Sequence, residues 1–159
     1  MGHLFALIAN TGMEALLSGC LAAILAQILK FIFYTVINKK IDFRVFTTTG
    51  GMPSSHSAGV VALATSIGIM TGFMSYLFAI AMGNAFVVMY DAAGIRRASG
   101  KMAVCLNKIM EDFYKHDINA AGTKLKELLG HTPVEVFCGA ILGVVFAFYF
   151  HYLLRSFAG

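Results

Sequence analysis

Three long apolar segments restrict the folds that this sequence can adopt. They run from about Gly12 to Ile37, from His56 to Met89 and from about Val134 to Leu154. A helix crosses the hydrocarbon core of a bilayer with about 20 predominantly apolar residues. Of all residues 58% are hydrophobic and 13% are charged, whereas an average soluble domain carries about 25% charged residues. We therefore expect an integral membrane protein and exclude an ordinary soluble enzyme.

The middle apolar segment is too long for one span, because it covers 34 residues. Thr71-Gly72 divides it into two short spans joined by a tight turn or, alternatively, into a re-entrant hairpin. The sequence thus predicts an all-α fold, an integral membrane bundle of about four transmembrane helices. No linker or repeat interrupts it, so we expect one domain, residues 1–159.

The polar region between Tyr90 and Thr132 holds one helical pattern. Its apolar residues recur at helical spacing: Met102, Leu106, Ile109, Met110 and Phe113. This pattern predicts an amphipathic helix on the membrane surface or on the other helices. Residues 119–122 interrupt the pattern, and residues 124–129 add one or two turns.

The distribution of positive charge predicts the orientation. With four spans, both termini lie on one side of the membrane, together with Arg155. The loops on the other side carry ten Lys and Arg residues, three in residues 38–55 and seven in residues 90–132. Cytoplasmic loops are rich in Lys and Arg. We expect a multi-pass protein of the plasma membrane with both termini outside, and we attribute the net charge of +4 to lipid head groups rather than nucleic acid.

Several polar residues interrupt the apolar segments. Gln27 and Lys30 share a helix face in the first segment, where Lys30 either faces the protein interior or extends to the interface. His151 has no partner nearby in sequence, so we expect it at the surface. The three cysteines lack metal-binding spacing, and we expect them to be packing residues: Cys20, Cys105 and Cys138.

Both prolines stand where a polar loop becomes an apolar helix, and each has a histidine beside it. Pro53 precedes Ser54-Ser55-His56, and Pro133 follows His131-Thr132, with Thr132 as a plausible N-cap. A helix start presents free backbone N–H groups and a positive dipole end, which suit phosphate. The predicted topology places both starts at the same membrane face.

These features predict a metal-independent phosphoryl transfer without a cofactor. One histidine attacks phosphorus, a carboxylate fixes its tautomer, and the second histidine protonates the leaving oxygen. Glu135 lies four residues after His131, on the same helix face. Arginine and lysine would hold the phosphate oxygens; the candidates are Lys30, Arg44, Arg96 and Arg97. Asp91 is a further candidate, either as an N-cap or as a partner of Arg96.

Two segments resemble signatures of the type 2 phosphatidic acid phosphatase superfamily, which also includes vanadium haloperoxidases. Residues 53–58, Pro-Ser-Ser-His-Ser-Ala, resemble the second signature, and residues 131–143 resemble the third. The whole chain, including residues 90–97, is similar to the divergent, membrane-embedded branch of that superfamily. The resemblance implies His131 as nucleophile, Glu135 in place of the usual Asp as its partner, and His56 as general acid. It also places Ser54 and Ser55 on the phosphate.

Besides Glu135, the chain departs from the superfamily pattern at three places. The first signature is missing, Ser55 replaces a glycine, and no arginine stands shortly before His131. We therefore expect a phosphatase acting on a lipid or isoprenoid phosphate or diphosphate, with a non-catalytic lipid-phosphate binder or transporter as the alternative. A small channel or structural protein is a third hypothesis, because Gly-xxx-Gly faces allow homo-oligomers. The partners expected in each case are membrane lipids.

Overall fold

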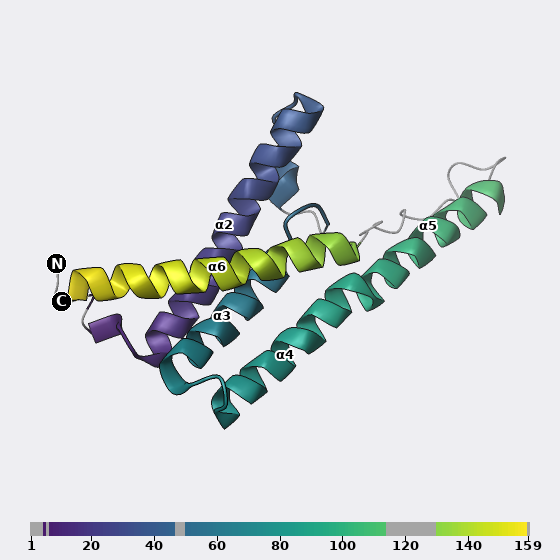
Figure 1. The fold of residues 1–159 in the computed structure, drawn as a ribbon. Coiled ribbons are helices and arrows are strands. Elements are labelled where there is room, and N and C mark those ends of the chain that lie inside the picture. The colour runs from purple at the N-terminus through teal and green to yellow at the C-terminus, as the bar shows by residue number, and fades with distance from the viewer. Residues whose placement is uncertain (1–4, 6, 47–49, 114–129, 159) are drawn as a thin grey trace.

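The computed structural model describes residues 5, 7–46, 50–113 and 130–158, and every regular element among them is helical. In the described part of the chain the main helices follow in this order (Figure 1): α2 (Gly12–Asn38), the short 3-10 helix η1 (Phe43–Phe46), α3 (Ser55–Thr71), α4 (Tyr76–Ala93), α5 (Ile95–Phe113) and α6 (Pro133–Ala158). The predicted all-α membrane bundle is confirmed. The predicted helix at residues 124–129 lies outside the described residues.

Three apolar stretches are long enough to cross a membrane: Gly12–Asn38, Tyr76–Met110 and Pro133–Phe157. The fourth predicted span is α3, an apolar helix of 17 residues, which is at the lower limit for crossing. Gly72, with a φ of 89°, ends α3, and the Ser75 side chain caps α4 by accepting a hydrogen bond from the Phe78 N–H. The tight turn predicted at Thr71-Gly72 therefore separates two helices.

Helix α3 is the centre of the bundle and packs against α2, α4 and α6. Small residues allow these contacts. A Cβ atom added at Gly19 would meet the Gly59 carbonyl at 3.0 Å, and one added at Gly143 would overlap the Ala58 backbone. Since small residues let membrane helices approach closely, the Gly139–Gly143 motif is used within the chain, against α3.

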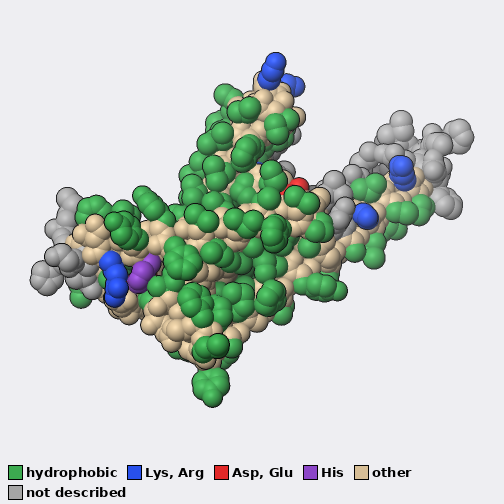
Figure 2. All heavy atoms as spheres, viewed as in Figure 1, with side chains coloured by type: hydrophobic (Ala, Val, Ile, Leu, Met, Phe, Trp, Pro, Cys, Tyr) green, Lys and Arg blue, Asp and Glu red, His purple; other side chains and the backbone are tan. Residues whose placement is uncertain are grey.

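The larger apolar side chains point outward. Phe86, Tyr90 and Phe137 are each more than 60% exposed, and hydrophobic side chains cover most of the face in Figure 2. A surface of this kind suits lipid rather than water. The Lys and Arg side chains visible in Figure 2 lie toward the ends of the molecule.

The helix directions place both chain ends together (Figure 1). The Phe5 and Phe157 rings stack with 5.5 Å between their centroids. Gly19 lies beside Leu63 and Ala23 beside Gly59, whereas Gly139 lies beside Ser57 and Gly143 beside Ala62. Helix α2 therefore runs antiparallel to α3, and α6 runs parallel to α3.

Helix α5 is the predicted amphipathic helix, although it begins earlier, at Ile95. It continues away from the bundle after α4 (Figure 1), and α4 is the one helix it contacts among the described elements. Of the two predicted positions, packing on the other helices is limited to α4 among the described elements. Its contact with the membrane surface stays a prediction.

Candidate functional site

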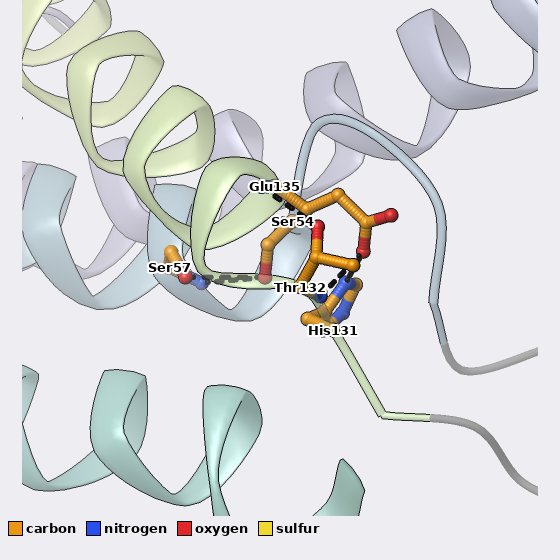
Figure 3. A network of polar contacts seen from close by, with 5 residues as sticks. All are labelled: Ser54, Ser57, His131, Thr132 and Glu135. Carbon is orange, nitrogen blue, oxygen red and sulfur yellow. Dashed lines mark hydrogen bonds and ion pairs between the residues drawn. The ribbon is translucent and has the colours of Figure 1, made fainter.

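The start of α6 holds His131 in place. Pro133 is the first helical residue. The Glu135 N–H donates to Thr132 Oγ1 at 3.3 Å, and the Thr132 N–H donates to Glu135 Oε2 at 3.1 Å. This reciprocal pair is a capping box. The same Glu135 Oε2 lies 3.1 Å from His131 Nδ1 (Figure 3), so the residue that caps the helix also orients the imidazole.

The start of α3 is tied to the start of α6. Ser54 caps α3, and its Oγ accepts hydrogen bonds from the Ser57 N–H at 3.4 Å and from the Ser57 hydroxyl at 3.1 Å (Figure 3). The Ser54 N–H donates to the Glu135 carbonyl at 3.0 Å. The His131 N–H donates to the Ala92 carbonyl of α4 at 3.1 Å. The starts of α3 and α6 and the end of α4 are therefore joined by backbone hydrogen bonds.

The two histidines predicted to converge do so. The ring centroids of His56 and His131 lie 6.0 Å apart, with an angle of 66° between the ring planes. His131 is 2% exposed, whereas His56 is exposed. The two imidazoles come from segments 75 residues apart in sequence, so the fold and not local geometry brings them together.

Lys30 is buried, at 4% exposure, so it does not extend to the interface. Its aliphatic stem lies against Gly51, where an added Cβ would meet Lys30 Cδ at 3.3 Å; the φ of 89° at Gly51 also favours glycine. Lys30 is close enough to Glu135 and His131 to interact with both electrostatically. Lys30 and Glu135 also line a pocket of about 500 Å³ with Gly50 and Thr132.

Burial lowers the pKa of His131 below its usual value. Hydrogen bonds to the Glu135 carboxylate and to the Gly51 backbone oppose this shift, whereas the nearby Lys30 ammonium adds to it. A lowered pKa means that the ring is neutral at pH 7. A neutral ring that donates from Nδ1 to Glu135 carries its lone pair on Nε2.

The other predicted site residues are placed as follows. Ser55 is 8% exposed and starts α3, while Ser54 Oγ is used for capping. Asp91 lies in the last turn of α4, so the N-cap interpretation is wrong. The side chains of three predicted phosphate-binding residues lie outside the described part of the chain: Arg44, Arg96 and Arg97.

A groove that reaches His56 was not predicted. It has a volume of about 590 Å³ and follows the contact between α2 and α3. Ser55, His56 and Gln27 line one end, and Leu16 and Leu63 line the other. Gly19 and Gly59 are the sequence signal for this close helix contact, but neither shows that a groove runs beside it.

The comparisons with known proteins agree with the motifs. The family model described as the divergent PAP2 family matches residues 11–146. The chain is 42% identical over 141 residues to the uncharacterized membrane protein YuiD of Bacillus subtilis (strain 168), which covers 82% of this chain and 89% of that protein. No solved structure matches the chain. With two histidines at joined helix starts and a family match over most of its length, the chain is an integral membrane protein that belongs to the divergent PAP2 family.

Proposed function

We propose that this protein is a membrane phosphatase that hydrolyses a lipid or isoprenoid phosphate or diphosphate through a phosphohistidine. The observation that carries the proposal is the 6.0 Å separation of the His56 and His131 rings, with Glu135 on Nδ1 of His131. Membership in the divergent PAP2 family supports it.

In the first step, His131 Nε2 attacks phosphorus, and the bond from phosphorus to the lipid oxygen breaks. His56 gives its proton to that oxygen, and the lipid alcohol leaves. Glu135 keeps the proton on Nδ1 and stabilises the positive charge that develops on the ring. Lys30 and the backbone N–H groups at the start of α3 stabilise the charge on the phosphoryl oxygens.

In the second step, water attacks the phosphohistidine. His56, now neutral, takes a proton from that water, and the bond between phosphorus and His131 Nε2 breaks. Inorganic phosphate leaves, and His131 returns to its neutral form. The exposed position of His56 suits a group that exchanges protons with solution.

The groove between α2 and α3 supports a lipid substrate rather than a water-soluble one. Its lining is mainly apolar and reaches His56. Its α2 residues run from Leu16 to Ile28, which is about 18 Å at 1.5 Å per residue. We propose that the hydrocarbon chain lies in this groove while the phosphate lies between the histidines.

Phosphate release from a lipid phosphate by the purified protein tests the reaction. We expect His131→Ala to abolish release and His56→Ala to reduce it by about 10²-fold or more, the usual contribution of a general acid. His3→Ala is the matched control, because His3 precedes α2 and is far in sequence from both site histidines. Unchanged turnover in both site variants would reject the mechanism.

Alkylation of Cys20 tests the groove without requiring turnover. Cys20 is exposed and lines the groove, so a long-chain lipid phosphate should slow its reaction with a maleimide. Cys105 is also exposed but lies on α5, and its reaction should not change. Protection of Cys20 without phosphate release from any lipid phosphate would favour the second function, a non-catalytic lipid-phosphate binder or transporter.

One observation favours that second function. Ser54 Oγ, which the resemblance places on the phosphate, is hydrogen-bonded to Ser57, and Ser55 replaces a glycine. Both features reduce the room for phosphate at the start of α3. They concern turnover more than binding.

A further inference from the structure

Helices α2, α3 and α6 enclose a buried alanine layer, consisting of Ala22, Ala62 and Ala147, each 0% exposed. One helical turn from this layer, toward the end that carries both termini, each helix places a polar residue at the equivalent position: Ser18, Ser66 and His151. This second layer lies on the opposite side of the alanines from His56 and His131.

An ion pair joins this layer to the start of α2. His151 Nδ1 lies 2.5 Å from Glu14 Oε1, although the two residues are 137 positions apart. Glu14 Oε2 also accepts a hydrogen bond from the Asn10 N–H at 2.7 Å. The Glu14 side chain is 1% exposed and that of His151 is 16% exposed. The expected isolated surface position of His151 is therefore wrong.

The two serines of the layer are buried and unpartnered. Ser18 is 0% exposed and Ser66 is 1% exposed. The hydroxyl oxygens of both have no hydrogen-bond partner among the described residues. A buried hydroxyl without a partner is costly, and a site that holds water needs two to four polar partners.

Few other charged groups among the described residues reach this end of the bundle. Arg155 lies one turn beyond His151 on α6 and is exposed. Over its described length, α3 has no acidic or basic residue apart from His56 at its other end, and α4 has none before Asp91. On α2 the next charged residue is Lys30, at the far end.

We propose that Glu14, Ser18, Ser66 and His151 form a second site, which binds a proton together with water. The Glu14–His151 pair holds the proton, and the two hydroxyls hold water beside it, since a hydroxyl both donates and accepts. A metal ion is a poorer fit, because the described residues contain no group of three or more metal-ligating His, Cys, Asp or Glu side chains. This site is independent of the proposed phosphatase activity.

His151 is more exposed than Glu14, and this difference gives proton entry into the site a direction. A proton from solution reaches the Nε2 of the partly exposed His151, and the Nδ1 proton then passes to Glu14 Oε1 behind it. Figure 2 shows a histidine side chain at the surface beside a basic one, at the end of the molecule where Figure 1 marks both termini. The alanine layer separates this route from His131.

Proton NMR of the protein in proteoliposomes tests the pair. We expect a far-downfield resonance from the proton between His151 and Glu14, absent in Glu14→Gln and in His151→Gln. Glu135→Gln is the matched control, since it removes a carboxylate from the other histidine, and it should retain the resonance. Circular dichroism identifies variants that fail to fold, and a resonance that persists in either folded variant overturns the proposal.

Two further measurements test the direction and the water. Raising the pH only on the side that carries the termini should move the resonance upfield, because the Nε2 proton is lost while the Nδ1 proton stays hydrogen-bonded to Glu14. Raising the pH only on the other side should leave the resonance in place. In Ser18→Ala/Ser66→Ala, exchange of this proton with water should slow at least tenfold. The proposed site would be refuted if the resonance responds to pH on the side away from the termini. It would also be refuted if the proton exchanges with water as fast in the double variant as in the wild type.

Discussion

Glu135 performs two tasks at once, because one oxygen of its carboxylate accepts the Thr132 N–H and contacts His131 Nδ1. Glu135→Gln separates them. The amide oxygen still accepts the Thr132 N–H, so we expect the melting temperature to change little. The amide cannot stabilise a positive imidazole, so we expect kcat to fall by about 10²-fold or more. A parallel loss of stability and activity would show that Glu135 acts only as a helix cap.

The pKa of His131 predicts how stability depends on pH. Burial lowers this pKa in the folded state, so the unfolded chain binds a proton more readily than the folded one. The stability that a neutral His131 contributes is present above about pH 6.5, the unfolded value, and is lost as the pH falls through the lower folded value. We expect the melting temperature in detergent to decrease below pH 6.5, and less so in His131→Asn than in His3→Ala.

Among the helices, the contact of α3 with α6 decides whether the histidines meet. A Cβ added at Gly139 would overlap the Ser54 carbonyl, so Gly139→Ala must push the two helix starts apart. We expect a loss of about 1–3 kcal/mol, as for overpacking, together with lower phosphatase activity.

Gly83→Ala is the control for this variant, because an added Cβ there meets nothing within 4 Å. An alanine within a helix is favoured over glycine by about 1 kcal/mol, so stability should not decrease. If Gly139→Ala is as stable and active as Gly83→Ala, the close contact does not position the site.

The sequence predicted most helices because their signals are local. The apolar length of α2, the turn after Thr71 and the Thr132–Glu135 cap each lie within one short segment. The His56–His131 pair was predictable only through the topology, which placed two helix starts at one face. The Glu14–His151 pair was not predictable, because its residues lie in different helices and neither has a nearby motif.

At the scale of the whole molecule, the bundle has two unlike ends. One end holds Lys30, His56, His131 and Glu135, and the other holds both termini with Glu14 and His151. The excess of Lys and Arg lies in the loops at the histidine end. Because such loops remain in the cytoplasm, we propose that phosphate is released on the cytoplasmic side and that both termini lie outside.

Cysteine labelling in intact cells measures this orientation. In a chain without native cysteines, Lys40→Cys lies at the histidine end, and Tyr152→Cys, which is 73% exposed as Tyr152, lies near the termini. A membrane-impermeant maleimide added outside should label the Tyr152→Cys chain, whereas the Lys40→Cys chain should react only after the cells are opened. The reverse pattern would place the histidines outside, where a phosphatase would act on lipids of the outer leaflet, and would also move the proton-binding pair to the cytoplasmic side.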